Sequence, residues 1–329
     1  MKHATRLSDL GPEVVAEILA TAILWKTQPA RKHLRDKLLG MLFLNPSLRT
    51  RASFEAVMAR GGGSALALEA GSTSWKLEDR PGAIMDGDRP EHLREAIPVL
   101  CRYLDALAVR AFATGPDDES EREPLLNAIK AHATVPIVSM EGAREHPCQG
   151  LADLMTIEEN FGLTKGLPVA LLWAPHIKPL PKAVPQSFLL TAAMRGCDIR
   201  VAHPPGFELH PQVIREAESY ATQSGGKVSL GNELEVALAG TRVVYAKAWG
   251  PATASGLAAE EVKKHPSWMT SPAHLQQAAA DAIFLHCLPV RRNVEVADAV
   301  LDSPWSRVID QAENRFHVQR ALLDWLFRP

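Results

Sequence analysis

The segment LGMLFLNPSLRTRASFEAVMARGG, residues 39–62, places an apolar run directly before an amphipathic one. The apolar run ends at Asn45, and we expect a helix to begin near residues 50–53. A short apolar run bounded by turn residues is typical of a buried strand in a parallel sheet. The segment therefore predicts a strand, a turn and a helix, which is the repeating unit of a layered α/β fold.

Seven further apolar runs alternate with amphipathic stretches in the same way. They are residues 65–69, 105–112, 134–140, 168–174, 197–203, 242–249 and 282–288. Four of the eight runs precede His146 and four follow it. We therefore expect an α/β protein with two doubly wound parallel-sheet domains of similar size.

The expected domains cover residues 1–145 and 146–305. The remaining segment, residues 306–329, contains AENRFHVQRALLDWLF, which has the pattern of a long amphipathic helix. We expect this C-terminal helix to pack back on the first domain.

Composition excludes several classes of protein. The 329 residues carry a formal net charge of -2 without a long basic run, so we expect no nucleic acid or membrane partner. The start MKHATRLSDL lacks the apolar core of a secretory signal, and the four cysteines form no C-x-x-C pair. We interpret this as a cytoplasmic enzyme without a disulfide framework or zinc site.

Glycine-rich nucleotide signatures are missing as well. Neither RGGGSAL, residues 60–66, nor SGGKVSLG, residues 224–231, fits G-x-G-x-x-G, and no G-x-x-x-x-G-K-[ST] occurs. These absences argue against a nicotinamide enzyme and a P-loop kinase.

The junction after the first strand is a candidate anion site. Ser47, Arg49, Thr50 and Arg51 crowd the start of the predicted helix. Free N–H groups, the helix dipole and charge-assisted hydrogen bonds all favour a phosphate there. An N-capped helix with solvated arginines is the alternative, and the short motif alone does not decide between the two.

Three further motifs follow at predicted strand ends: VRAF from Val109, EHPCQGLADLMTI from Glu145 and FLHCLPVRRN from Phe284. Together with S-x-R-T-R, in this order and spacing, they resemble the aspartate/ornithine transcarbamylase family over nearly the whole chain. The resemblance implies that the first domain binds carbamoyl phosphate, the second binds the amino acid, and catalysis takes place in the cleft.

The resemblance also implies the residues of each site. The residues expected to bind carbamoyl phosphate are Ser47, Leu48, Arg49, Thr50, Trp75, Arg110, His146, Pro147, Cys148, Gln149, Cys287, Leu288 and Arg315. Among them Arg49, Thr50, Arg110 and His146 are the expected catalytic residues, because donors preorganised around the carbamoyl carbonyl stabilise its tetrahedral oxyanion. The mechanism needs no metal, cofactor or covalent nucleophile, since the leaving phosphate can accept the proton of the amine.

Single residues of this set have ordinary alternatives. A lone histidine such as His146 is more often structural, Cys287 could be a small buried hydrophobe, and Arg315 could be an exposed helix arginine. The motif context, not the residue type, favours the functional interpretation.

The acceptor amine is indicated by RVVYAKAWGP, residues 242–251. Ornithine transcarbamylases carry an aspartate segment here that binds a free α-ammonium group, whereas this chain has Lys247, which would repel it. The segment is similar to the branch that acts on N-acetylated ornithine. The resemblance then implies that Lys247, Glu141 and Leu288 bind acetylornithine, although Lys247 and Glu141 could be ordinary surface charges.

Two residues, Glu78 and Glu295, are expected to set acceptor specificity. Glu78 lies with Trp75 on a loop that, in this family, reaches the neighbouring subunit of a homotrimer with shared active sites; a solvated loop with an exposed tryptophan is the alternative. A carboxylate at Glu78 would admit acetyl and repel succinyl, and succinyl-specific relatives carry proline at the matching position. Glu295 stands where acetyl-specific relatives have a lysine that can be carboxylated, so it can supply a similar negative charge without CO₂.

Three functions remain open on these residues. The first is an N-acetylornithine carbamoyltransferase of arginine biosynthesis. The second is a transcarbamylase for another amine, such as N-succinylornithine or ornithine. The third is a non-catalytic protein that binds carbamoyl phosphate.

Overall fold

The computed structural model describes residues 1–28, 32–112, 122–251, 260 and 263–328. The chain divides into two compact units, Met1–Cys148 with Arg315–Pro329 and Gln149–Asn314. We expected domain boundaries between residues 145 and 146 and between 305 and 306, whereas the boundaries of the units lie between Cys148 and Gln149 and between Asn314 and Arg315. Both observed changes lie inside helices, α6 (Pro147–Phe161) and α13 (Val308–Phe327).

The first unit contains a four-stranded parallel sheet with the strand order β2-β1-β5-β6. Its strands are β1 (Leu38–Phe43), β2 (Ser64–Glu69), β5 (Ala106–Arg110) and β6 (Ile137–Glu141). A separate pair, β3 (Leu77–Glu78) and β4 (Glu91–His92), belongs to the connection that follows β2. Every residue of β5 and β6 is buried, which explains why these strands are continuous apolar runs in the sequence.

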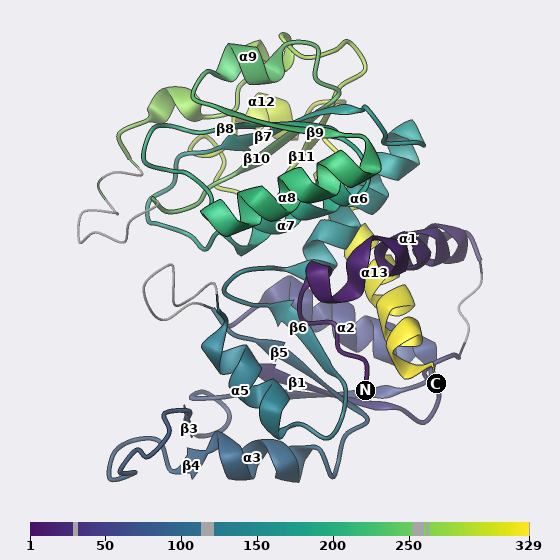
Figure 1. The fold of residues 1–329 in the computed structure, drawn as a ribbon, viewed down its shortest axis with the longest axis vertical. Coiled ribbons are helices and arrows are strands. Elements are labelled where there is room, and N and C mark those ends of the chain that lie inside the picture. Colours follow the sequence, from purple (N-terminus) through teal and green to yellow (C-terminus); the bar gives the residue numbers. More distant parts are fainter. Residues whose placement is uncertain (29–31, 113–121, 252–259, 261–262, 329) are drawn as a thin grey trace. The chain divides into compact units, whose positions relative to one another are not determined.

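Helices α1, α2, α3 and α5 complete the first unit, together with the C-terminal part of α13 (Figure 1). They span Leu7–Lys26, Leu48–Gly61, Leu93–Leu100 and Pro124–His132. Helix α2 begins at Leu48, earlier than expected, because Ser47 is its N-cap and accepts a hydrogen bond from the N–H of Thr50. It ends where Gly62 adopts φ 84°, a left-handed conformation that glycine adopts without strain.

The chain reverses its winding direction within this sheet. It passes from β1 to β2 on one side and then returns to β5 on the other side of β1. In open α/β sheets, ligands bind outside the carboxyl ends of the strands at such a reversal. The Asn45 carboxamide ties the two strand ends together, since its Oδ1 accepts a hydrogen bond from the N–H of Phe112 at 2.8 Å.

The second unit contains a five-stranded parallel sheet with the order β11-β10-β7-β8-β9. Its strands are β7 (Pro168–Trp173), β8 (Asp198–Ala202), β9 (Lys227–Gly231), β10 (Val243–Lys247) and β11 (Ile283–Leu285). The winding direction reverses between β7 and β10. All eight runs predicted as strands contain one, so the predicted fold class is confirmed. Strand β9 was not predicted, because it is an edge strand in which no residue is fully buried and in which apolar and polar residues are mixed.

Helices α7 (Ala183–Met194) and α8 (Pro211–Ser224) lie side by side along the sheet of this unit (Figure 1). The shorter helices are α9 (Leu234–Leu238), the 3-10 helix η1 (Pro266–Trp268), α11 (Pro272–Leu275) and α12 (Asp298–Leu301). Among the described residues, no helix is long and apolar enough to cross a membrane.

Two buried tryptophans fix the backbone after β10. The indole N–H of Trp173 donates to the carbonyl of Trp249 at 2.9 Å, and that of Trp249 donates to the carbonyl of Phe207 at 2.7 Å. Both side chains are fully buried, so their polar N–H groups need these partners. The hydrogen bonds hold the segment that carries Lys247.

Candidate active site

The start of α2 presents backbone hydrogen-bond donors. The Ser47 Oγ accepts from the N–H of Thr50 at 3.3 Å, and the other N–H groups of the first helical turn have no carbonyl partner within the helix. Leu48 is 83% exposed at this turn, so the backbone there is accessible. The positive end of the helix dipole adds to these donors.

Arg315 reaches this turn from α13. Its side chain is buried, and its Nη2 donates to the hydroxyl of Thr50 at 2.8 Å. The exposed-arginine alternative is therefore wrong. Burial lowers the pKa of Arg315, and Arg110 and Arg49 lower it further, although Cys148 and Glu141 oppose them. The three guanidiniums are thus close enough to repel one another, and a bound dianion would relieve that repulsion.

Arg110 is the last residue of β5 and Glu141 the last of β6, and the two are paired in the sheet. Arg110 Nη1 donates to Glu141 Oε2 at 2.5 Å, and the guanidinium lies 4.6 Å from the centroid of the Phe112 ring. Glu141 is 9% exposed, so it is not the surface charge that the alternative proposed. Its carboxylate is one negative charge beside a cluster of positive ones.

His146 lies in the same unit, immediately before α6. Its Nε2 is 3.8 Å from Glu141 Oε2, and its side chain is 3% exposed. Burial lowers the pKa of His146 well below its ordinary value, and the charges of Arg315 and Arg110 lower it further. The imidazole is therefore neutral near pH 7 and can donate a hydrogen bond from only one ring nitrogen.

This burial predicts a pH dependence of stability. Below pH 6.5 the unfolded chain binds a proton at His146 and the folded chain does not, so the free energy of unfolding falls as the pH drops. Above that pH the group has no effect. We expect a contribution of about 1.4 kcal/mol per pH unit below about pH 6. Urea unfolding of the wild type and of His146→Gln from pH 5 to 8 measures it as the difference between the two. Parallel pH curves for the two proteins would contradict the assignment.

Pro147, Cys148 and Gln149 begin helix α6. Burial raises the pKa of the Cys148 thiol to about 11, so it is neither a thiolate nor a nucleophile near neutral pH. Gln149 belongs to the second unit, where its Nε2 donates to Asp153 Oδ1 at 2.7 Å. The motif is thus divided, with His146 held in the first unit and Gln149 in the second.

In the second unit, Lys247 is the last residue of β10. Its Nζ donates to the carbonyl of Ala248 at 3.0 Å, and the side chain is buried, so the surface-charge alternative is wrong. Glu295 is 1% exposed, and its Oε2 accepts from the N–H of Arg291 at 2.7 Å. Burial alone would raise the pKa of Glu295, but His286 and Lys247 outweigh it, so the net shift is downward. Glu295 is a buried carboxylate on which the charge of Lys247 acts.

Two residues that interact with Glu295, His176 and Arg291, were not predicted as site residues. His176 Nε2 accepts from Arg291 Nε at 3.1 Å, and the charges of Glu295 and Lys247 also act on the imidazole. His176 follows the carboxyl end of β7, and that position was the signal that could have identified it.

Cys287 and Leu288 follow β11. The N–H of Leu288 donates to His286 Nδ1 at 3.0 Å, and Leu288 itself adopts φ 55° in the left-handed region. A leucine in this region is strained, and such strain is often found at functional sites. The acceptor role of Nδ1 places the imidazole proton on Nε2, which faces Glu295 Oε1 at 3.7 Å.

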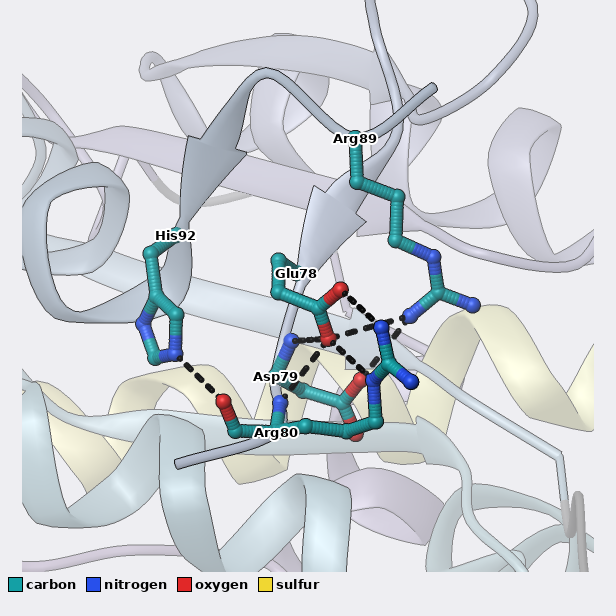
Figure 2. A network of polar contacts seen from close by, with 5 residues as sticks. All are labelled: Glu78, Asp79, Arg80, Arg89 and His92. Carbon is teal, nitrogen blue, oxygen red and sulfur yellow. Dashed lines mark hydrogen bonds and ion pairs between the residues drawn. The ribbon is translucent and has the colours of Figure 1, made fainter. Parts of the chain in front are cut away.

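The connection after β2 carries Trp75 and Glu78 (Figure 2). Trp75 is 60% exposed, and its Nε1 donates to Glu91. Glu78 is 2% exposed, and both of its oxygens accept from Arg80, at 2.8 and 2.9 Å. Figure 2 shows the carboxylate enclosed by Arg80, the backbone of Asp79 and Arg89.

These contacts neutralise the charge of Glu78. Its hydrogen bonds to Arg80 are the main cause that lowers its pKa to about 2, so it is ionised, but its charge is compensated within the loop. The side chains of Arg80 and Arg89, in contrast, are 71% and 43% exposed. Beside the buried Glu78 carboxylate the loop therefore exposes two guanidiniums, of which Arg89 also pairs with the 39% exposed carboxylate of Asp79.

Comparison with known proteins agrees with both units. Residues 2–159 match the model of the aspartate/ornithine carbamoyltransferase carbamoyl-P binding domain, and residues 181–326 match that of the Asp/Orn binding domain. The N-acetylornithine carbamoyltransferase of Xanthomonas campestris pv. campestris is 36% identical over 98% of this chain and 97% of its own length. The N-succinylornithine carbamoyltransferase of Bacteroides thetaiotaomicron is 40% identical over 85% of this chain and 84% of its own length.

A solved structure is similar over the full length. The crystal structure of acetylornithine transcarbamylase complexed with acetylcitrulline has a TM-score of 0.95 with 33% identity, and the match covers 100% of both chains. Sequence and fold thus lead to the same assignment: the chain belongs to the aspartate/ornithine carbamoyltransferase family.

Proposed function

We propose that this protein transfers the carbamoyl group of carbamoyl phosphate to the δ-amine of N2-acetyl-L-ornithine, giving N-acetyl-L-citrulline and phosphate. The observation that carries the proposal is the cluster of Arg49, Arg110 and Arg315 around the start of α2, beside a neutral buried His146. The names of the Xanthomonas relative and of the acetylcitrulline complex support acetylornithine as the acceptor.

The proposed chemistry uses these residues as donors. The start of α2 and the arginines bind the phosphate, while Thr50, Arg110 and His146 donate to the carbamoyl oxygen as it becomes an oxyanion. The amine nitrogen attacks the carbamoyl carbon, the bond from that carbon to the phosphate oxygen breaks, and the phosphate takes the proton of the amine. A neutral His146 suits this role, because it stabilises the oxyanion by donating a hydrogen bond.

The second unit would bind the amino acid. Lys247 pairs with the α-carboxylate and its positive charge rejects a free α-ammonium group. Glu295 compensates the charge of Lys247 and is proposed to act as a permanent counterpart of a carboxylated lysine. Glu141 is proposed to contact the acylated nitrogen, although its hydrogen bond to Arg110 also ties it to the carbamoyl phosphate residues.

Assembly, location and pathway are further parts of the proposal. The exposed side chains of Trp75, Ile84 and Met85, at 60%, 83% and 40%, lie on one connection and support a homotrimer in which this loop enters the neighbouring site. Four free cysteines are consistent with the cytoplasm. A role in arginine biosynthesis follows from the proposed product.

A second candidate acceptor is N-succinylornithine. The case for acetyl over succinyl depended on an unpaired carboxylate at Glu78, and that carboxylate is enclosed by Arg80 and Arg89 (Figure 2). Exposed guanidiniums attract the extra carboxylate of a succinyl group. The Bacteroides relative, which is named for succinylornithine, also matches this chain at 40% identity.

One assay tests both candidates. Formation of citrulline-type products is measured with ornithine, N-acetylornithine and N-succinylornithine at equal concentrations. We expect kcat/KM for ornithine to be lower by at least about 100-fold than for the acylated acceptor, because Lys247 meets a like charge. A higher kcat/KM for succinyl that is lost in Arg89→Gln would select the second candidate. Carbamoyl phosphate binding without turnover of any acceptor would indicate a non-catalytic protein.

A further inference from the structure

Asp153 is a fully buried carboxylate that the proposed reaction does not use. It lies one helical turn after Gln149 on α6, and its Oδ1 accepts from the Nε2 of Gln149 at 2.7 Å and from the Nε2 of Gln311 at 2.6 Å. Both glutamine side chains are buried as well. One carboxylate oxygen therefore holds two amide groups in the interior of the second unit.

Such an oxygen determines which way each amide faces. A carboxylate only accepts, whereas an amide has a donor end and an acceptor end. Both glutamines must turn their nitrogen toward Asp153 and their Oε1 the other way. For Gln311 the result is visible, since its Oε1 accepts from the N–H of His286 at 2.9 Å. The orientation imposed by Asp153 thus extends to the start of the HCLP motif.

Tyr245, the third residue of β10, interacts electrostatically with Asp153 and with Cys287 of the same motif. Burial raises the pKa of this phenol well above its ordinary value, and its interactions with Asp153 and Cys287 raise it further. Tyr245 therefore remains a neutral phenol. By hydrogen bonds, Asp153 is linked to Gln149 of one motif and, through Gln311, to His286 of another.

We propose that Asp153 is a positioning residue that orients the Gln149 amide so that its Oε1 faces the carbamoyl nitrogen. The inference rests on the proposed function, in which Gln149 contacts the carbamoyl group. A carbamoyl NH₂ is a donor, so only the carbonyl end of the amide can accept from it. In the opposite orientation the NH₂ group of Gln149 would point at the carbamoyl NH₂, so two donors would meet and a buried N–H group would lose its hydrogen bond.

A double-mutant cycle tests this role. Asp153→Asn keeps the volume but can donate as well as accept, so the Gln149 amide loses its fixed orientation. We expect kcat to fall about 100-fold in the wild-type background, as for other small misplacements of a reacting group. In the Gln149→Ala background the same change should lower kcat by less than about 3-fold, because nothing remains to be oriented. Additive effects in the two backgrounds would overturn the proposal.

Thr156→Val is the matched control. Thr156 is also a buried polar residue of α6, and it accepts from Asn314 Nδ2 on α13 at 2.9 Å, yet it contacts neither glutamine in the described structure. We expect this variant to lower the melting temperature while changing kcat by less than about 3-fold in either background. If Thr156→Val lowered kcat strongly in the wild-type background but not in the Gln149→Ala background, the loss of any buried polar group of α6 would have the same effect as Asp153→Asn.

A second variant gives a signature that a structural role does not. Gln149→Glu places a second carboxyl group beside Asp153, so the two groups share a proton at low pH. The protonated new carboxyl then donates to Asp153, and its carbonyl oxygen can still accept a hydrogen bond from the carbamoyl nitrogen. The ratio of variant to wild-type kcat should therefore fall as the pH rises from 6 to 9. The nearby titratable groups Tyr245, Cys287 and His286 are the same in both proteins, so the ratio isolates the new carboxyl. A ratio independent of pH would contradict the proposal.

The same variants distinguish a failure of the proposed function from a failure of the positioning role of Asp153. If the wild type transfers no carbamoyl group to any acceptor, the proposed function fails. The cycle is then measured as carbamoyl phosphate binding by calorimetry, where Asp153→Asn should weaken binding only when Gln149 is present. If the wild type is active and the two changes are additive, only the positioning role of Asp153 fails.

Discussion

Arg49→Ala is expected to lower kcat/KM for carbamoyl phosphate by about 1,000-fold. The guanidinium lies at the exposed start of α2 and acts electrostatically on Arg315, which places it beside the proposed phosphate. Removing one charge-assisted donor from a preorganised anion site has effects of about this size. Steady-state kinetics with carbamoyl phosphate as the varied substrate measures the loss.

Arg51→Ala is the control for this experiment. Arg51 belongs to the same helical turn, but its side chain is 47% exposed and forms ion pairs with Glu55 and Glu69. Its removal should change kcat/KM by less than about 3-fold, because exposed ion pairs contribute little. Equal losses in the two variants would mean that the general charge of α2, and not the position of Arg49, attracts the substrate.

Lys247→Met is expected to raise KM for the acylated acceptor by about 100-fold and to leave KM for carbamoyl phosphate nearly unchanged. Methionine fills a similar volume without the charge, so the α-carboxylate of the acceptor loses its proposed partner. Varying each substrate in turn separates the two KM values.

Because Glu295 is buried, Lys247→Met is expected to affect stability as well as acceptor binding, and a double variant separates the two effects. Without Lys247 the carboxylate loses a positive charge that lowers its pKa, so Lys247→Met should also be less stable. Lys247→Met combined with Glu295→Gln should recover stability but not acceptor affinity. If the double variant recovers the KM for the acceptor as well, the lysine serves the fold and not the substrate.

The sequence predicted the fold class well because the strands of parallel sheets are buried on both faces. Runs such as residues 105–112 and 168–174 are therefore continuous and easy to recognise. Strand β9 lacks that signal, since three of its five residues are exposed and its partner is on one side only. Its place in the sheet depends on pairing with β8, which no local pattern encodes.

The candidate site could be predicted only where a residue stands in a motif. Arg49 and His146 were found in this way, and their roles remain proposals. His176 was missed because its contacts with Arg291 depend on where β7 ends relative to a distant loop. Asp153 belongs to the motif that contains His146, but one of its two amide partners, Gln311, lies 158 positions away in the chain on α13, whereas the other, Gln149, is four positions away on the same helix.

Glu78 illustrates a different limit. The sequence gives its charge, and the expectation assigned that charge to an acyl substrate. Two residues later, Arg80 forms two hydrogen bonds with the carboxylate, so the loop compensates the charge itself. Whether a charge is available to a substrate depends on side-chain geometry, which a loop without regular periodicity does not reveal.

The first unit is discontinuous in the chain, because Arg315–Pro329 belongs with Met1–Cys148. A ribosome therefore releases the whole continuous second unit before it releases the helix that completes the first. During synthesis the contact between Thr50 and Arg315 cannot form before the second unit has been made, so the cluster of guanidiniums forms after that unit. Nascent chains consequently cannot assemble the proposed phosphate site early, and premature termination between Asn314 and Arg315 would yield a complete second unit and an unfinished first one.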